Sequence, residues 1–239
     1  MTDGTLISVL GLGLILGVRH ALDPDHIVAV STIVSESKSV RGSSLVGTFW
    51  GLGHTMSLLI AGVLVIALKV QISARLALWL EFSVALMLIV LGVKAIHKFL
   101  RGGKLHVHHH THDGSTHTHL HVHRPGEEHG HGHRHLIRSG VRPFLVGMVH
   151  GVAGSATLMI LVLATLPSAV AGLIYIAVFG LGSVGGMLVM SSLISLPFVF
   201  TVRRFKFISQ ALQVMVGLFS LSFGVFLVWE YCVHERLIF

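Results

Sequence analysis

The chain has 239 residues, of which 53% are hydrophobic and only 11% are charged, and its mean hydropathy is +0.82. This composition excludes an ordinary soluble domain and predicts a protein that crosses a membrane several times. The net charge of +7 is not a nucleic-acid footprint, because the basic residues fall in a few loops, and the single cysteine, Cys232, excludes an internal disulfide.

Six apolar runs bounded by polar loops predict six transmembrane helices. Each run is long enough to cross about 30 Å of hydrocarbon. The first and fifth runs are longer than this thickness requires, which predicts a tilt or a break in each. The runs cover residues 5–34, 43–68, 75–98, 141–166, 170–199 and 207–231.

Lysine and arginine are distributed unevenly between the two sides of these predicted spans. The loops after the first, third and fifth spans hold twelve of them, and the opposite side holds three. Because short cytoplasmic loops carry the excess of basic residues, we expect those three loops in the cytoplasm and both termini outside. The twelve are Lys38, Arg41, Lys98, Arg101, Lys104, Arg124, Arg134, Arg138, Arg142, Arg203, Arg204 and Lys206, and the three are Lys69, Arg75 and Arg236.

Short segments of the chain recur in the same order at a nearly constant interval. Chance matching between glycine-rich apolar helices is the alternative explanation, but we favour a duplication of three spans. An odd number of spans per half inverts the second half, as in many alternating-access transporters. The matches are 17–21 with 147–151, 49–54 with 178–183 and 91–93 with 223–225, at intervals of 130, 129 and 132 residues.

The predicted fold is therefore an all-α membrane protein of six helices arranged as a 3+3 inverted repeat. The first repeat covers residues 1–98 and the second covers residues 141–239. Residues 99–140 form the connecting loop, which we expect in the cytoplasm.

This central loop holds thirteen of the nineteen histidines, from His106 to His135, many at alternating positions. It has no apolar pattern that could form a core, so we expect a disordered segment. Its spacing does not match a zinc finger, but histidine-rich tracts bind divalent late transition metals at several graded sites. We expect the loop to bind such metals; the alternative is a solvated linker that tolerates histidine.

The segment from His20 to His26 places two imidazoles and two carboxylates within seven residues, at the end of an apolar run. Ionisable groups at membrane depth are costly and usually mark an ion path or a proton relay. Pro24 removes a backbone donor and disfavours helical dihedral angles in the preceding residue. The sequence therefore predicts a helix break at residues 21–24, a device with which many transporters build a site near the bilayer midplane.

The side chains of this segment indicate a metal ligand set. In a continuous helix His20, Asp23 and His26 would lie within one arc, and a break at the proline would let Asp25 turn inward. Neutral imidazoles with carboxylates suit Ni²⁺, Co²⁺ or Zn²⁺, whereas Mg²⁺ and Ca²⁺ prefer oxygen ligands. Arg19 is an alternative partner for one of the carboxylates.

Two more histidines lie in other apolar runs. His54 is interpreted beside the first cluster as a further ligand or relay; the alternative is a buried histidine bonded to a neighbouring helix. His150 stands in the second half where His20 stands in the first, and a metal role and a structural role are equally open for it. We expect no catalytic residue and no resident cofactor, and the candidate metal residues are His20, Asp23, Asp25, His26, His54 and His150.

The pattern Arg-His-Ala-x-Asp-x-Asp-His at residues 19–26 resembles the signature of the nickel/cobalt transporters. Gly53-His54-Thr55, after Phe49, resembles the next helix motif of that family. Six predicted spans and the sequence after His150 are more similar to the shorter, urease-accessory-type permease branch. The resemblance implies a permease of the bacterial cytoplasmic membrane in which His20, Asp25 and His26 handle Ni²⁺ or Co²⁺, with His54 accessory.

We therefore expect a secondary transporter of Ni²⁺ or Co²⁺ and not an enzyme, with uptake slightly favoured. The alternatives are an efflux permease, a metal-independent proton channel and an intramembrane metalloenzyme, although the last requires several histidine boxes and one is present. The expected partners are the metal ion and the lipid bilayer. The resemblance also implies a link to urease or hydrogenase maturation, and the sequence leaves a homo-oligomer open.

Overall fold

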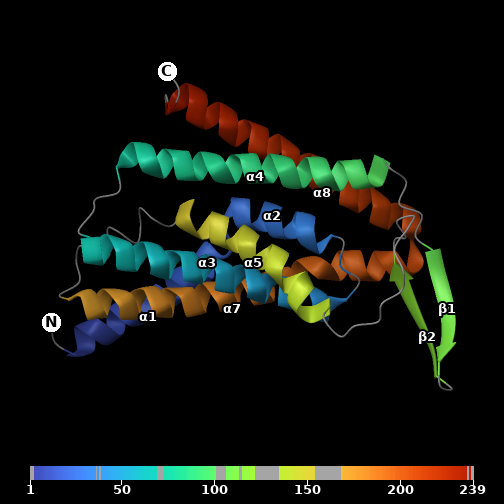
Figure 1. Cartoon of the computed structure of the whole chain (residues 1–239), viewed down its shortest axis with the longest axis horizontal. Helices are drawn as coiled ribbons and strands as arrows, with labels where there is room; N and C mark the ends of the chain where they lie inside the picture. The colour runs from blue at the N-terminus through green and yellow to red at the C-terminus, as the bar shows by residue number, and fades with distance from the viewer. Residues whose placement is uncertain are drawn as a thin grey trace.

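In the computed structural model, apolar helices make up most of the described chain (Figure 1). The structure describes residues 3–35, 37, 39–68, 73–100, 106–112, 115–121, 135–153, 168–235 and 237. The elements are α1 (Asp3–His20), α2 (Pro24–Val34), α3 (Val40–Leu68), α4 (Ala74–Leu100), β1 (His106–His112), β2 (Ser115–His121), α5 (His135–Ala153), α7 (Ala169–Arg204), α8 (Lys206–Trp229) and the π-helical η1 (Glu230–His234).

Four helices of the described chain, α3, α4, α7 and α8, are long and apolar enough to cross a membrane. The helices α1 and α2 pass the same test together, bent by 53° at the break between them. The predicted fourth span begins within α5, but residues 154–166 lie outside the described part. The membrane region is thus all-helical with four or five candidate spans, and the six-span prediction is tested only in part.

The two long predicted spans differ from each other. The first is broken after His20, as predicted. The fifth, α7, is a continuous helix of 36 residues with Pro197 inside it. At about 1.5 Å per residue, such a helix is far longer than about 30 Å of hydrocarbon. It therefore tilts in a membrane or extends beyond it.

The helices form a bundle and a separate pair (Figure 1). Helix α3 packs against α7, α1 lies along α7, and α5 lies along α3. Helices α4 and α8 pack together, and the short helix α2 contacts both of them as well as α3 and α7. One buried apolar cluster joins these parts and includes Val30 of α2, Trp50 of α3, Leu88 of α4 and Met187 of α7.

Glycines allow the bundle helices to approach closely. A Cβ added at Gly17 of α1 would collide with the carbonyl oxygen of Phe179 on α7. A Cβ added at Gly147 of α5 would collide with the carbonyl oxygen of Trp50 on α3. Small residues permit such contacts between membrane helices, so these two positions fix how α1 meets α7 and how α5 meets α3.

Two further glycines, on the partner helices α3 and α7, lie at the same two helix crossings. A Cβ at Gly53 of α3 would collide with the carbonyl oxygen of Phe144 on α5. A Cβ at Gly182 of α7 would collide with the carbonyl oxygen of Leu14 on α1. Each crossing therefore has a glycine on both helices, which brings the two backbones into direct contact.

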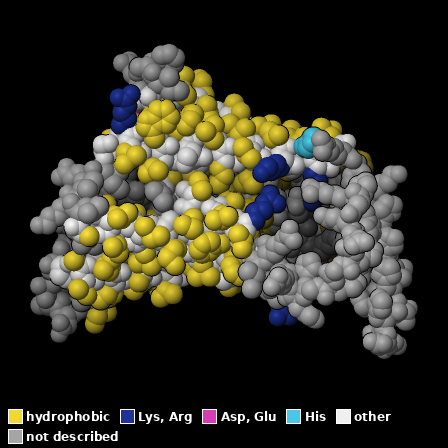
Figure 2. All heavy atoms as spheres, viewed as in Figure 1, with side chains coloured by type: hydrophobic (Ala, Val, Ile, Leu, Met, Phe, Trp, Pro, Cys, Tyr) yellow, Lys and Arg dark blue, Asp and Glu magenta, His cyan; other side chains and the backbone are white. Residues whose placement is uncertain are grey.

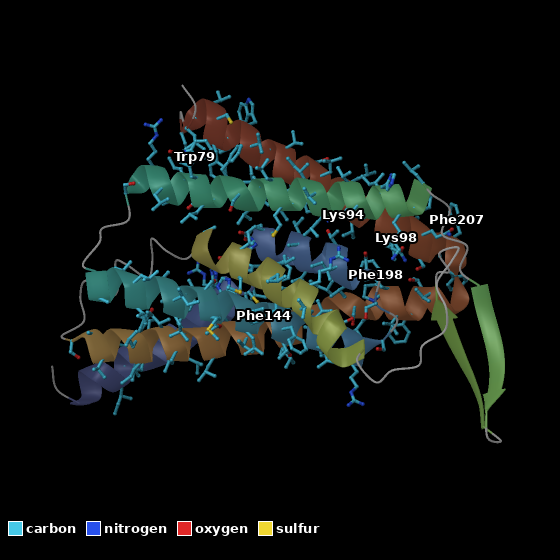
Figure 3. The ribbon with its side chains drawn as sticks, in the orientation of Figure 1. Trp79, Lys94, Lys98, Phe144, Phe198 and Phe207 are labelled. Carbon is cyan, nitrogen blue, oxygen red and sulfur yellow. The ribbon has the colours of Figure 1, made fainter. Side chains whose placement is uncertain are left out.

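Large apolar side chains cover most of the described surface in Figure 2. Phe207 is 82% exposed and Phe200 is 71% exposed, both without a covering element. Figure 3 shows Trp79 at the end of α4 away from the hairpin and Phe207 at the end of α8 near it, with Lys94 and Lys98 toward the end of α4 that faces the hairpin. An apolar outer surface with few charges is what a lipid bilayer requires.

The central loop corrects one prediction. Within the predicted disordered segment, residues 106–112 and 115–121 form an antiparallel hairpin, β1 and β2, in which His106 pairs with His121 and His112 with Ser115; residues 101–105, 113–114 and 122–134 lie outside the described part. Alternating histidines with β-branched Thr and Val have the period of a strand, and the Asp113-Gly114 dipeptide between the strands favours a two-residue hairpin connection. The alternation of histidine with other residues therefore predicted β-strands, whereas the sequence analysis interpreted it only as a metal-binding pattern.

Candidate metal centre

The break between α1 and α2 lies where the proline predicts it. The amide N–H of Asp23 donates to the carbonyl of His20 at 3.0 Å, which ends α1 in a tight turn. Asp23 is extended, with φ −62° and ψ 145°, as expected for a residue before proline. Pro24 is the first residue of α2, where a missing N–H costs nothing, and Ile27 donates to the Asp23 carbonyl at 3.0 Å.

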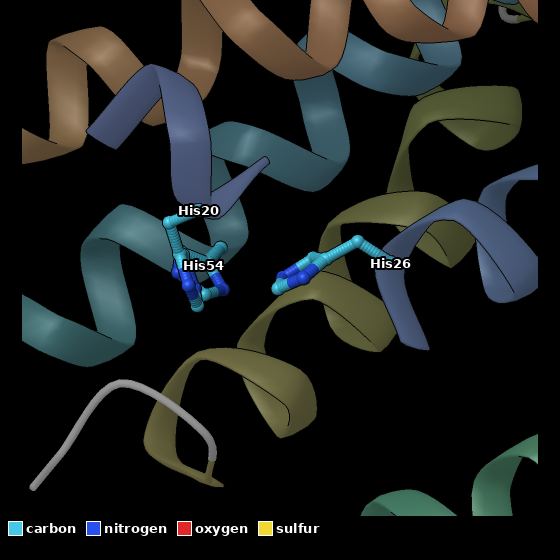
Figure 4. A group of neighbouring side chains, drawn as sticks. All are labelled: His20, His26 and His54. Atoms are coloured by element: carbon cyan, nitrogen blue, oxygen red, sulfur yellow. The ribbon is translucent and has the colours of Figure 1, made fainter. Parts of the chain in front are cut away.

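Three histidines from three helices meet beside this break (Figure 4). The ring of His20, at the end of α1, lies 4.6 Å from that of His26 on α2 and 5.0 Å from that of His54 on α3, measured between centroids. The His26 and His54 rings are 5.3 Å apart. One nitrogen from each ring lies within 4.8 Å of the others. We call His20, His26 and His54 the three-histidine set.

A second group shares His26 with the first. Oδ2 of Asp25 is hydrogen-bonded to Nε2 of His150 at 2.9 Å, and Oδ1 of Asp25 lies 3.4 Å from Nδ1 of His26. The rings of His26 and His150 are 4.1 Å apart. Asp25, His26 and His150 each offer a ligand atom within 4.8 Å of the others, and we call them the aspartate set. The predicted inward turn of Asp25 is therefore present, and His150 does lie at the centre.

Asp23 occupies a different place from the other predicted residues. Its carboxylate lies 2.7 Å from Nδ1 of His20, but the side chain is 46% exposed and belongs to neither set. A carboxylate on the far nitrogen of a ligating histidine fixes the tautomer and directs the opposite nitrogen to the metal. Arg19 is exposed, and both carboxylates contact histidines.

The four histidines at the centre are buried, and most of their ring nitrogens have no hydrogen-bond partner among the described residues. His26, His54 and His150 have no exposed surface, and His20 is 7% exposed. Within the described chain, no hydrogen bond reaches Nε2 of His20, Nε2 of His26 or either ring nitrogen of His54. Buried polar groups are normally paired, and each unpaired one costs about 1–3 kcal/mol. A cluster of unpaired imidazole nitrogens with carboxylates nearby has the donor chemistry of a divalent late transition metal site.

Two aromatic residues that the sequence analysis did not single out line this centre. Trp50 lies 5.7 Å from the ring of His150, and Phe179 lies 5.5 Å from the ring of His20. Trp50 precedes His54 by four residues, so both lie on one face of α3. That spacing was visible in the sequence, whereas the contact between Phe179 and His20 depends on how α1 meets α7.

The second half carries a serine where the first carries His54. Ser183 follows Phe179 by four residues, as His54 follows Trp50. It is fully buried, and its hydroxyl has no hydrogen-bond partner among the described residues. At the same spacing from a ring that lines the centre, α3 therefore carries an imidazole and α7 carries a hydroxyl.

The centre lies beside the middle of α3. His54 is the central residue of α3 (Val40–Leu68), so a turn count of about 1.5 Å per residue places it about 21 Å from either end. A hydrocarbon layer of about 30 Å centred on α3 would therefore have its midplane close to His54.

A family model described as high-affinity nickel-transport protein, NicO, matches residues 6–227. The chain belongs to this family. The resemblance carried by residues 19–26 and by Gly53-His54-Thr55 is thereby confirmed. The NicO family is one of metal transport proteins and not of enzymes, as expected from the sequence.

Relatives of this NicO protein include one that covers nearly its full length. The urease accessory protein UreH from Bacillus sp. (strain TB-90) is 38% identical over 99% of this chain and 97% of its own. Two chloroplast proteins of Arabidopsis thaliana, FOR GROWTH AND FERTILITY 2 and 1, are 28% and 26% identical over 73% of this chain, which is 44% and 46% of their lengths. No solved structure matches the chain.

Proposed function

We propose that this NicO-family protein carries Ni²⁺, or Co²⁺, across the bacterial cytoplasmic membrane as a secondary transporter. The observation that carries the proposal is the cluster of buried, unpartnered histidine nitrogens at the centre of α3, beside a broken helix. Broken helices at the midplane are how many secondary transporters hold a substrate ion. The candidate ligands are the three-histidine set and the aspartate set, with Asp23 orienting His20.

The donor set accounts for the choice of metal. Imidazole nitrogens suit Ni²⁺, Co²⁺ and Zn²⁺, and the described centre has no thiolate that would favour Cu⁺. Asp23 and Asp25 offset the charge of a divalent cation in surroundings of low dielectric constant. Family membership makes nickel the first ion to test.

A 3+3 inverted repeat is the arrangement through which we propose that the ion gains access from alternate sides. Its support is the reciprocity of the glycine contacts. Gly17 in the first half meets Phe179 in the second, and Gly147 in the second half meets Trp50 in the first. Gly17 and Gly147 are 130 residues apart, and Trp50 and Phe179 are 129 residues apart. The repeats would be residues 1–98 and 141–239, with the histidine-rich segment 99–140 between them.

The proposed orientation has both termini outside and the histidine-rich segment in the cytoplasm. In Figure 1, α1 begins and η1 ends at one end of the molecule, whereas the hairpin lies at the opposite end. The loops predicted after the first, third and fifth spans hold twelve of the lysines and arginines, and this excess supports a cytoplasmic placement of those loops. Loop histidines would then bind Ni²⁺ or Co²⁺ inside the cell.

Uptake is the direction we propose first, because the full-length relative UreH is a urease accessory protein and the matching family model is described as a high-affinity nickel-transport protein. A link to urease or hydrogenase maturation follows as part of the same proposal. Efflux is the second candidate, because a cytoplasmic hairpin rich in histidine would collect metal for export as readily as it would buffer arriving metal.

The test is flux of radioactive ⁶³Ni²⁺ into proteoliposomes under an imposed metal gradient, with and without a pH gradient. Wild type is compared with His26→Ala, which removes the residue common to both sets, and with His97→Ala as a matched control. His97 is exposed on α4 and belongs to neither set. Saturable flux in wild type and His97→Ala, lost in His26→Ala, is the expected result.

Other outcomes of this experiment contradict the proposal. Equal flux in wild type and His26→Ala would remove the centre from the transport path. Absence of Ni²⁺ and Co²⁺ flux in wild type, together with metal-independent proton flux, would favour the proton channel. Comparison of outward-facing and inward-facing reconstitution then separates uptake from efflux.

A further inference from the structure

His26 belongs to both ligand sets, and this sharing has a consequence for how an ion would move. Its ring lies 5.3 Å from that of His54 in the three-histidine set and 4.1 Å from that of His150 in the aspartate set. It is the third residue of α2, after Pro24 and Asp25. No other residue of the described chain belongs to both sets.

The two sets are too widely spread to surround one ion. Nitrogen ligands lie about 2.0–2.1 Å from Zn²⁺, so two donors to the same ion of that size are at most about 4.2 Å apart. Ligand atoms lie within 4.8 Å of one another inside each set, but no choice of ligand atoms among the described residues brings all five residues of the two sets within that distance. His150 is also held by Asp25 across 2.9 Å, whereas His20 is held by Asp23 across 2.7 Å. The geometry therefore contains two overlapping positions for a cation.

The two positions differ in chemistry. The three-histidine set offers three neutral donors, and its nearest carboxylate, Asp23, touches it only through His20. The aspartate set offers a carboxylate directly with two imidazoles. A divalent ion therefore keeps more positive charge uncompensated in the first position than in the second.

The two positions also differ in the part of the fold that builds them. The three-histidine set comes entirely from α1, α2 and α3, whereas the aspartate set joins α2 to His150 of α5. Helix α5 lies after the histidine-rich segment, in the second half of the chain. Movement of an ion from one set to the other is thus movement from the first half to the junction between halves.

We propose that the transported ion is handed from one set to the other while it stays bound to His26. The ion exchanges His20 and His54 for Asp25 and His150, so ligands are replaced two at a time without release into the apolar interior. Because the two positions share one ring, they are occupied one at a time. This inference rests on the proposed transport function and adds an internal step to it.

The experiment separates binding from movement. Purified full-length wild type, His54→Ala, His150→Ala and His26→Ala are titrated with Co²⁺, and each visible spectrum is taken as a difference from His26→Ala. The histidine-rich segment is the same in all four proteins, so its contribution cancels. Parallel flux is measured in proteoliposomes, with His97→Ala as the control expected to match wild type.

We expect His54→Ala and His150→Ala each to retain one Co²⁺ that His26→Ala lacks. Their difference spectra should differ from one another, because the first keeps the aspartate set and the second keeps the three-histidine set. Both should lose flux at least about 10-fold, the lower limit seen when groups that support metal ligands are removed. The same pattern is expected with His54→Asn and His150→Asn, which are the second variants if an alanine protein fails to fold.

Three results would overturn the handover. One is that either single variant binds no more Co²⁺ than His26→Ala, which would mean one undivided site. Another is that the two variants have identical spectra, and the third is that either transports like wild type. Each of these leaves wild-type flux in place, so the handover fails while the transport proposal stands; loss of wild-type flux overturns the transport proposal itself.

Discussion

The two halves of the molecule pack alike but carry different chemistry. Gly17 and Gly147 bring their helices against Phe179 and Trp50 in the same way. The polar residues near these contacts differ: His54 lies four residues after Trp50 on α3, and Ser183 lies four residues after Phe179 on α7. Each of the two helix crossings requires its own small residues where the backbones touch. A single metal centre, by contrast, needs only one set of ligands. Packing is therefore preserved where chemistry is not.

The largest difference between the halves is expected from His54→Ala compared with Ser183→Ala. Loss of the imidazole removes a ligand from the three-histidine set, so Ni²⁺ flux should fall about 100-fold, the upper range for disturbed metal sites. Ser183→Ala removes a buried hydroxyl without a described partner, so flux should stay near wild type. Initial rates of ⁶³Ni²⁺ flux at equal protein in the vesicles measure both. A similar loss in both variants would break the comparison.

Asp25→Asn tests the contact between the carboxylate of Asp25 on α2 and the ring of His150 on α5. The carboxylate lies 2.9 Å from Nε2 of His150, and the neutral amide would neither compensate an ion nor hold the ring as an anion does. We expect about 10-fold to 100-fold weaker Ni²⁺ transport, measured as flux at low substrate concentration. Asp25→Glu is the control that keeps the charge. Wild-type behaviour of Asp25→Asn would place the aspartate set outside the ion path.

Asp23→Asn should have a smaller effect, because this carboxylate acts only through His20. Loss of such a supporting group costs about 10-fold in metal affinity at the mild end of the usual range. The expected signature is a raised half-saturating Ni²⁺ concentration with an unchanged maximal flux. A drop in maximal flux equal to that of Asp25→Asn would instead make Asp23 a direct ligand.

The smallest effect on transport per folded molecule is expected from Gly17→Ala and Gly147→Ala. Each added methyl group meets a backbone carbonyl of the facing helix and should destabilise the protein by about 1–3 kcal/mol, as overpacking does. Thermal unfolding in detergent should show similar losses for the two variants. Gly11→Ala is the matched control, because nothing lies near an added Cβ there. Unequal losses would contradict equivalent packing of the halves.

Much of the site could be predicted because its cause is local. Pro24 disrupts its own helical turn and keeps Asp23 extended. The break, and the closeness of the His20 and His26 rings on either side of it, therefore follow from neighbouring residues. The family signature lies in the same short segment. The hairpin was also local, in the alternation of residues 106–112 and 115–121, but that period was interpreted only as metal-binding composition.

The apolar helices, the break at Pro24, the types of candidate ligand and the family followed from the amino-acid sequence alone. The contact of His150 with Asp25, the place of Phe179 beside His20 and the division of the candidate ligands into two sets sharing His26 were visible only once the helices were packed. Periodicity specifies which side chains share a face of one helix, but not which helices face each other. That choice depends on backbone approach at Gly53 and Gly182, contacts between residues far apart in the chain.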